Sequence, residues 1–313
     1  MKKILVFGVS GLTGYKIANL ASKDYQVFGT YNKRKPDIQN ISSIQINLTD
    51  RNHLNKIFNE IKPNFVINTT ALHNVDYCEE NPDESFLLNS KIPQHLFENS
   101  ENHKAKFVHI STDYVFDGKK TLPYNEEDDA IPISVYGESK LDGEKILKNT
   151  RHVVLRSSVV YGWTPMELAG TISSSGKPMN FAMWLLSKLH AGEPLKIVTD
   201  QFATATLADS LAESALKFAT NNLSGLYHLS GLSCESRFDF SRKFAKEFGY
   251  DKNLISATDS SQFKQKAKRP KYSCLDCSKA KGLGLNLLDT NNALKIMRSQ
   301  VEREASYLIG KNQ

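Results

Sequence analysis

Short apolar runs alternate with longer amphipathic stretches along the first half of the chain. The apolar runs have the length of buried strands, and the amphipathic stretches place apolar side chains at helical spacing. The predicted strands are residues 3–9, 26–31, 43–46, 65–69, 106–111 and 152–156. The predicted helices are residues 13–22, 53–61, 82–98 and 134–149. Strands that alternate with helices predict βαβ units, so we expect an α/β fold with a doubly wound parallel sheet of the Rossmann type.

This alternation ends beyond residue 162. Residues Ser173–Pro178 have the composition of a loop, and an apolar run at residues 225–230 predicts one more strand that returns to the sheet. The helices predicted in this half are residues 181–190, 207–220, 238–248 and 292–304. We therefore expect two domains. The first covers residues 1–162 with a returning segment near 200–232, and the smaller, mainly C-terminal domain comprises residues 163–199 and 233–313.

The composition is that of a globular protein, with 40% hydrophobic and 24% charged residues in a chain of 313. Its longest apolar runs are far shorter than the roughly 20 residues that cross a bilayer. The apolar stretch that follows Met1 is too short for a signal peptide and leads into glycines. We therefore expect a cytoplasmic protein with no membrane partner.

The formal net charge is +6, and the basic residues are scattered apart from a cluster at Lys264–Lys271. A nucleic-acid-binding surface usually combines a basic stripe with interleaved aromatic residues. Only Tyr272 lies near this cluster. We expect no nucleic-acid partner, whereas small anionic ligands suit the charge.

The four cysteines are Cys78, Cys234, Cys274 and Cys277, and the last two form a CxxC pair. A redox motif or half of a zinc site can have this spacing. The sequence has neither a second CxxC pair nor histidines at metal-ligand spacing. We therefore expect reduced structural thiols and no metal site.

A glycine-rich segment, Gly8-Val-Ser-Gly-Leu-Thr-Gly14, directly follows the first predicted strand and opens the first predicted helix. Glycines here permit a tight turn and a close backbone approach to a pyrophosphate, which the helix N-terminus attracts. Its GxxGxxG spacing suggests the short-chain dehydrogenase class, so a dinucleotide cofactor is expected. The predicted cofactor contacts are Gly8, Ser10, Gly11, Leu12 and Gly14.

The residues after the second predicted strand select between NAD and NADP. This segment, Thr30-Tyr-Asn-Lys-Arg-Lys35, has no carboxylate for a ribose 2′-hydroxyl but offers cations for a 2′-phosphate. Arg34 is the best candidate because its guanidinium can bind phosphate with two parallel hydrogen bonds. We expect NADPH, with NADH left open; the alternative is a solvated basic loop. Further predicted cofactor contacts are Tyr31, Leu48, Asp50, Thr70 and Ala71, with Asp50 placed to bind the adenine amino group.

Tyr136 and Lys140 lie four residues apart on a predicted helix, so they share one face. A tyrosine with its ordinary pKa of about 10 is a weak acid at neutral pH, and a nearby ammonium is expected to lower that pKa. Lys140 can also bind the nicotinamide ribose. With Thr112 at the end of the fifth predicted strand, these residues form a hydroxyl–Tyr–Lys set suited to proton transfer. The predicted catalytic residues are therefore Thr112, Tyr136 and Lys140, the last two also contacting the cofactor.

These motifs together resemble those of the dTDP-4-dehydrorhamnose reductases, a family of extended short-chain dehydrogenases. The segments that carry the resemblance are Gly8–Gly14, His109–Gly118, Tyr136–Lys140 with Gly143-Glu144, and Arg156–Gly162. The likeness extends over nearly the whole chain through Asn68–Asp76, Asp200-Gln201, Arg269-Pro270 and Leu275-Asp276.

Two positions depart from the family pattern. The segment Asp200–Thr206 lacks the glycine and proline of the family's DQxGxPT, and Val159 stands where the family commonly has tryptophan. Both positions lie on the expected substrate side. The identity of the sugar and of its nucleotide is therefore left open.

The resemblance implies NADPH-dependent reduction of the 4-keto group of a nucleotide-linked 6-deoxy sugar. It also implies substrate contacts at Asp113, Val115, Gln201 and Arg269. Arg269 is the expected diphosphate anchor because its guanidinium can bind bidentately, although its cluster has the alternative of being a solvated surface. Two other functions stay open: a nucleotide-sugar epimerase or dehydratase, and a non-catalytic NADP-binding subunit resembling the regulatory subunit of methionine adenosyltransferase. A homodimer is also left open.

Overall fold

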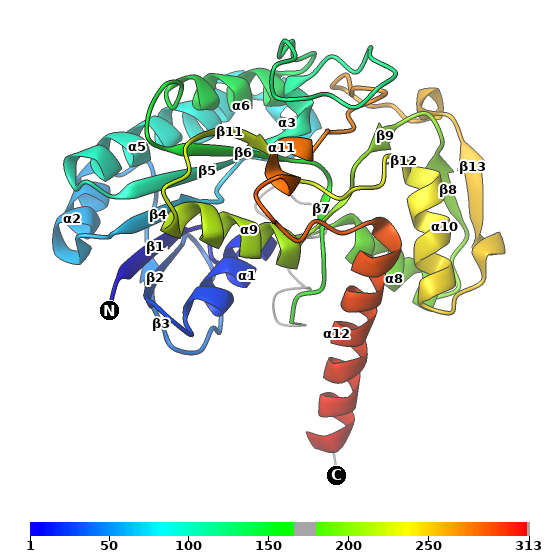
Figure 1. Cartoon of the computed structure of the whole chain (residues 1–313). Helices are drawn as coiled ribbons and strands as arrows, with labels where there is room; N and C mark the ends of the chain where they lie inside the picture. Colours follow the sequence, from blue (N-terminus) through cyan, green and yellow to red (C-terminus); the bar gives the residue numbers. More distant parts are fainter. Residues whose placement is uncertain (166–179, 312–313) are drawn as a thin grey trace.

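The computed structural model describes residues 1–165 and 180–311, and the side chains of residues 305–311 are not described. The predicted loop Ser173–Pro178 lies outside this part of the chain. Two lobes lie side by side in Figure 1, one around a large sheet and one made mostly of helices.

One sheet of seven parallel strands organises the larger lobe. In order across the sheet, the strands are β11 (Gly225–His228), β6 (Val153–Ser157), β5 (Lys106–Thr112), β4 (Phe65–Asn68), β1 (Lys3–Phe7), β2 (Gln26–Tyr31) and β3 (Ile41–Gln45). The chain first builds outward from β1 through β2 to β3 and then crosses to β4 on the opposite side. The order in which strands are added therefore reverses between β1 and β4. Folds of this type bind ligands at such a reversal. The predicted doubly wound Rossmann-type sheet is confirmed.

Apolar residues alternate in direction along β1 and so supply two cores. Ile4 and Val6 belong to the cluster under α1 (Leu12–Ala21) and α9 (Ala208–Thr220). Leu5 and Phe7 belong to the cluster on the opposite face. The helices on that face include α2 (Arg51–Ile61), α5 (Ile92–Asn102) and α6 (Val135–Lys145). Burial on both faces explains why these strands are continuous apolar runs.

The helix predicted over residues 82–98 is divided by a turn of π-helix. Its segments are α4 (Pro82–Phe86), the π-turn η1 (Leu87–Lys91) and then α5. A separate short helix, α3 (Val75–Glu80), precedes them. Pro93 lies in the first turn of α5 and has no N–H, so the carbonyl of Asn89 cannot receive its usual α-helical hydrogen bond. A π-turn at this point accommodates that missing donor.

The second lobe has its own apolar core, which includes Leu185, Phe240, Phe244 and Leu294. Its helices are α8 (Phe181–His190), α10 (Arg237–Glu247) and α12 (Thr290–Lys311), of which α12 projects away from the body in Figure 1. A parallel pair, β8 (Leu195–Val198) and β13 (Ile255–Thr258), completes it. This pair was not predicted, because each strand has only four residues and neither forms a continuous apolar run.

Smaller elements link or decorate the two lobes. The short strands are β7 (Val160–Tyr161), β9 (Phe202–Ala203), β10 (Thr206–Leu207) and β12 (Glu235–Ser236), paired as β7 with β10 and β9 with β12. The remaining helical segments are η2 (Asp113–Val115), η3 (Lys252–Leu254), η4 (Ser260–Gln262) and α11 (Ser278–Lys281). In the described part of the chain, no helix combines the length and apolarity needed to cross a bilayer.

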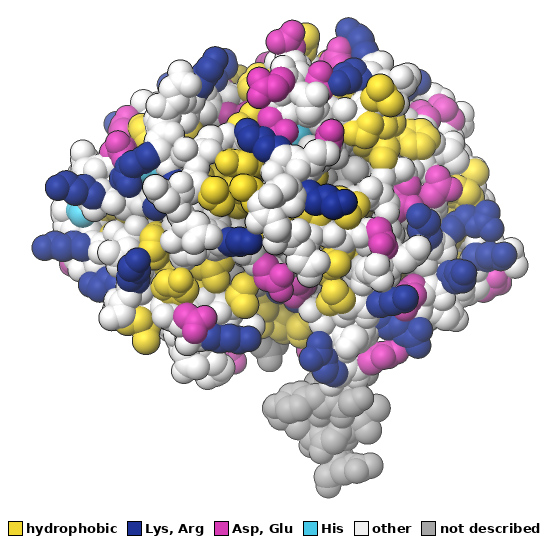
Figure 2. All heavy atoms as spheres, viewed as in Figure 1, with side chains coloured by type: hydrophobic (Ala, Val, Ile, Leu, Met, Phe, Trp, Pro, Cys, Tyr) yellow, Lys and Arg dark blue, Asp and Glu magenta, His cyan; other side chains and the backbone are white. Residues whose placement is uncertain are grey.

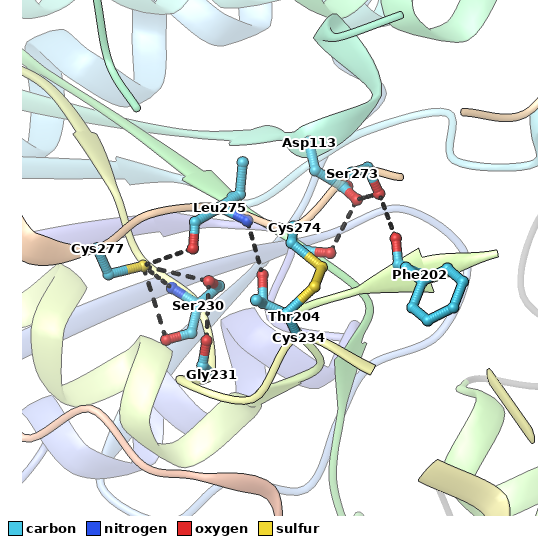
Figure 3. Close-up of a disulfide and its surroundings, with 11 residues drawn as sticks. Asp113, Phe202, Thr204, Ser230, Gly231, Cys234, Ser273, Cys274, Leu275 and Cys277 are labelled. Carbon is cyan, nitrogen blue, oxygen red and sulfur yellow. Dashed lines mark hydrogen bonds between the residues drawn. A yellow bond between two sulfur atoms is a disulfide. The ribbon is translucent and has the colours of Figure 1, made fainter. Parts of the chain in front are cut away.

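A disulfide joins Cys234 to Cys274 (Figure 3), with their Cα atoms 5.5 Å apart. The prediction of four reduced thiols is therefore wrong for these two residues, while Cys78 and Cys277 are free and buried. The CxxC spacing did not identify the pair, because the fold directs Cys277 toward Ser230, whose backbone N–H donates to its Sγ at 3.3 Å. The partner of Cys274 instead comes from a segment 40 residues away in sequence.

Charged side chains are dispersed over the face drawn in Figure 2, where lysines and arginines are interspersed with acidic residues. The basic cluster at 264–271 is itself partly neutralised. Lys266 contacts Glu80, and Arg269 pairs with Asp76. This cluster is therefore not a continuous basic stripe.

Reduction of the disulfide should destabilise the protein. Closure of a loop of this length is worth about 3–4 kcal/mol in chain entropy, and Cys234 is exposed to a reductant. We expect both dithiothreitol and Cys234→Ser to lower the Tm measured by calorimetry. A control variant, Cys78→Ser, should retain the response to dithiothreitol. An unchanged wild-type Tm in dithiothreitol would contradict a stabilising role.

Candidate active site

The glycine-rich segment lies where the strand order reverses, between the carboxyl ends of β1 and β4. Gly11 donates its N–H to the carbonyl of Gly8 at 3.0 Å, and Val9 donates to Thr30 at 2.9 Å. A Cβ on Gly14 would lie 2.2 Å from the carbonyl oxygen of Gly8, so this position has no room for a side chain. The first turn of α1 consequently begins directly above the end of β1, in the arrangement that binds a pyrophosphate.

The other predicted cofactor residues surround the same end of the sheet. Thr69 and Thr70 follow β4 and lie directly beside Gly8. Tyr31 ends β2, and the partly exposed Arg34 follows it. Asp50 is the N-cap of α2, where its carboxylate accepts the N–H of His53 at 3.0 Å. The remaining predicted contacts include the buried Leu12 and the partly buried Ser10, Leu48 and Ala71.

Thr112, Tyr136 and Lys140 are brought together from β5 and α6. The hydroxyl of Thr112 interacts with the phenol of Tyr136, and the ring of Tyr114 packs edge-on against the Tyr136 ring at 5.6 Å. Helix α6 comes this close because Gly137 has no side chain. A Cβ there would lie 2.2 Å from the carbonyl oxygen of Tyr114.

Burial raises the pKa of Tyr136, and this effect outweighs the interaction with the Thr112 hydroxyl, which lowers it. The prediction that the pKa of Tyr136 lies below its ordinary value is therefore wrong in direction. The physical reason is that a phenolate is costly in a site removed from water. Tyr136 thus keeps its proton at neutral pH, which suits a proton donor.

Lys140 is only 1% exposed, and its ammonium is correspondingly disfavoured. Burial lowers the pKa of Lys140 to about 8, although the Glu144 carboxylate acts in the opposite direction. Its Nζ lies 2.7 Å from the carbonyl oxygen of Ile110 and 3.3 Å from Nε2 of His109. This lysine can therefore gain or lose a proton close to neutral pH.

Asp113, a predicted substrate contact, is buried. Its carboxylate accepts a hydrogen bond from Ser273 at 2.5 Å (Figure 3). It also accepts from Ser158 at 2.8 Å and from Thr112 at 3.1 Å. Burial raises the pKa of Asp113, and these hydroxyl groups act against that rise. In this arrangement the carboxylate joins Thr112 to the C-terminal part of the chain.

The other predicted substrate residues lie in contrasting environments. Val115 is fully buried in a cluster with Phe116 and Leu275, which leaves its side chain no surface for a ligand. Gln201 is partly exposed and contacts Gln265 at 3.5 Å. Arg269 is placed near the site, but its guanidinium forms two hydrogen bonds with one carboxylate, that of Asp76, at 2.7 and 3.0 Å.

The sequence analysis missed Arg237, the first residue of α10. Its guanidinium carbon lies 5.1 Å from the ring centre of Phe181, and its charge interacts with Tyr114, Asp113 and Arg269. Burial lowers the pKa of Arg237. No local motif singles out this arginine, because only the docking of the second lobe brings it near the site.

Comparison with known proteins gives a family for the whole arrangement. A family model described as the RmlD substrate binding domain matches residues 1–302. A probable low-salt glycan biosynthesis reductase, Agl14, of Haloferax volcanii is 32% identical over 280 residues, covering 88% of this chain and 90% of that protein. A dTDP-4-dehydrorhamnose reductase of Aggregatibacter actinomycetemcomitans is 29% identical over 316 residues, covering 96% and 100% of the two chains.

A relative of a different kind is the methionine adenosyltransferase 2 subunit beta of Pongo abelii. It is 29% identical over 296 residues, covering 91% of this chain and 83% of that protein.

Solved structures agree with the family. A dTDP-4-dehydrorhamnose reductase of Clostridium acetobutylicum superposes with a TM-score of 0.80 at 29% identity, covering 96% of this chain and 99% of that one. The enzyme of that name from Bacillus anthracis, solved in complex with NADP, shares the fold with a TM-score of 0.80 at 24% identity, covering 96% and 100%. The predicted resemblance is thereby confirmed, and the chain belongs to the family of the RmlD substrate binding domain.

Proposed function

We propose that this protein reduces the 4-keto group of a nucleotide-linked 6-deoxy sugar with NADPH. The observation that carries the proposal is the interaction between the protonated Tyr136 and the hydroxyl of Thr112. A ketone needs both a hydride at carbon and a proton at oxygen, and Tyr136 is placed to give the proton. The relatives named as reductases support the same chemistry.

Tyr136, Thr112 and Lys140 each have a separate role in the proposed reaction. NADPH, when bound, supplies the hydride that adds to the carbonyl carbon. Tyr136 transfers its phenolic proton to the carbonyl oxygen, and the Thr112 hydroxyl hydrogen-bonds that oxygen as its negative charge develops. Lys140 lies one helical turn from Tyr136, where its ammonium form would stabilise the phenolate left behind.

The proposed cofactor contacts are those around the reversal of the strand order. The glycine segment and the start of α1 would hold the pyrophosphate. Arg34 would pair with the 2′-phosphate, and Thr70 with Ala71 would line the nicotinamide side. Asp50 already caps α2, so a contact with adenine would use the carboxylate oxygen that does not accept from His53.

A second candidate function is a non-catalytic regulatory subunit, which the match to the methionine adenosyltransferase subunit favours. The two candidates differ in one measurement. A reductase consumes NADPH stoichiometrically with a nucleotide-linked 4-keto-6-deoxy sugar, whereas a regulatory subunit or an epimerase does not. A set of dTDP-, UDP-, GDP- and CDP-linked substrates would also identify the nucleotide.

Removal of the Tyr136 hydroxyl should abolish most of the turnover. Loss of a general acid typically costs roughly 10²–10⁴ in rate, so we expect Tyr136→Phe to reduce kcat by that factor. The Kd for NADPH, measured by fluorescence titration, should change little. Tyr25→Phe, far from the site, is the matched control and should keep full activity. Near-normal turnover in Tyr136→Phe would mean that another group protonates the ketone.

Arg34 should determine the preference for NADPH over NADH. The Arg34→Ala variant removes the proposed partner of the 2′-phosphate, so we expect weaker NADPH binding and unchanged NADH binding. The difference should be greatest at low salt, where charges are least screened. Equal Kd values of the wild type for the two cofactors at low salt would refute this assignment.

Arg269 is hydrogen-bonded to Asp76, and we propose that it also binds the diphosphate of the substrate. We expect Arg269→Ala to raise KM for the nucleotide sugar without altering the Kd for NADPH, and Lys268→Ala to do much less. Asp76→Asn separates binding from structure, because it weakens the ion pair but retains the guanidinium. If Arg269 is only structural, Asp76→Asn and Arg269→Ala will have the same effect on KM.

A further inference from the structure

His109 occupies a buried position between two polar side chains that the mechanism above does not explain. It lies on β5 and is fully buried. Its Nδ1 is 3.1 Å from Nδ2 of Asn68, and its Nε2 is 3.3 Å from Nζ of Lys140. The imidazole therefore connects the end of β4 to the lysine of the proposed proton-transfer set.

The orientation of the Asn68 amide is determined by Thr70. The backbone N–H of Thr70, which can only donate, lies 3.0 Å from the Asn68 side-chain oxygen, and the Thr70 hydroxyl donates to the same oxygen at 2.6 Å. The amide nitrogen must then face His109. An amide NH₂ group has two donors and no acceptor, so Nδ1 of His109 has to accept.

A neutral imidazole carries one N–H, and the accepting Nδ1 places that hydrogen on Nε2. Burial, followed by the charge of Lys140, lowers the pKa of His109, so the ring is neutral. The Nε2–H then points at Nζ of Lys140. This contact is a hydrogen bond only when Lys140 is an uncharged amine, because an ammonium has no lone pair to accept it.

We propose that His109, held in the Nε2–H tautomer by Asn68, is a positioning residue that opposes the ammonium form of Lys140. The proposal deepens the proposed function, because it names what sets the protonation of a residue in the same site. His109 thereby disfavours the ammonium form of Lys140 in addition to the effect of burial. The imidazole favours the amine, and protonation of Lys140 requires the Nε2–H contact to be given up.

The other charged groups around this pair are accounted for. On α6, Glu144 acts on Lys140 in the opposite sense, and Tyr136 lies one turn away. On β6, Arg156 is paired with Glu144 at 2.7 Å, which limits the pull of that carboxylate on Lys140. On β4, Asn68 is uncharged. The Nε2–H tautomer of His109 is thus the polar feature that disfavours the ammonium form of Lys140 beyond the effect of burial.

The test begins with wild-type protein labelled with ¹⁵N-histidine. The ¹⁵N shifts of His109, assigned with His109→Phe, report which ring nitrogen carries the proton and require neither substrate nor cofactor. We expect the Nε2–H tautomer across neutral pH. An Nδ1–H tautomer or a cationic ring would overturn the proposal, even if the protein proved to be a reductase.

The second measurement is the pKa of Lys140, followed through its ¹³Cε shift in protein with labelled lysine. Asn68→Ala frees Nδ1 to take the proton, so that Nε2 can accept from an ammonium. We expect the pKa of Lys140 to rise by about one pH unit, a tenfold change in proton affinity.

The double variant provides the matched control. In the His109→Phe background there is no tautomer to release, so Asn68→Ala should leave the pKa of Lys140 unchanged. An equal shift in both backgrounds would show that Asn68 acts only by structure, and the proposal would fail. A different result would count against the proposed function alone. In that case the Nε2–H tautomer and the two expected responses of the Lys140 pKa are observed, but the wild-type protein does not oxidise NADPH.

Discussion

A buried ion pair between Glu144 and Arg156 holds the helix that carries both proposed proton-transfer residues. The Glu144 carboxylate accepts hydrogen bonds from Nε and Nη2 of Arg156 at 3.0 and 2.7 Å. The hydroxyl of Ser111 also donates to this carboxylate. The two charged side chains are only 7% and 5% exposed. Loss of one partner from such a pair typically costs about 3–5 kcal/mol, because the other charge is left unpaired. Since the pair joins α6 to β5 and β6, the place of Tyr136 and Lys140 over the sheet depends on it.

Removal from water then shifts the two proposed proton-transfer groups in opposite directions. Burial disfavours a phenolate and an ammonium alike, so it raises the pKa of Tyr136 and lowers that of Lys140. Tyr136 is consequently a stable proton donor, and Lys140 is a base of nearly neutral strength. One buried environment therefore keeps the proton on Tyr136 and weakens the hold of Lys140 on its own proton.

The second lobe reaches this site through hydrogen bonds and one covalent link. Ser273 donates to the carboxylate of Asp113, which in turn accepts from Thr112. The next residue, Cys274, is tied to Cys234 shortly before α10, whose first residue is Arg237. The disulfide therefore fastens two segments that both contribute to the site. Because these contacts join distant parts of the chain, docking of the second lobe completes the surroundings of Thr112.

Local patterns in the sequence were sufficient for the sheet, the glycine segment and the placement of Tyr136 and Lys140 on one helix. Each depends on residues within one strand, one turn or one helix, where periodicity and steric limits act directly. The protonation states, the disulfide and the partner of Arg269 could not be predicted in this way. Arg269 meets Asp76 across 193 residues of sequence, and His109 meets Asn68 across 41. Burial and charge pairing arise only when such segments pack together, so the tertiary structure alone decided which of the predicted groups hold a proton and which are already paired.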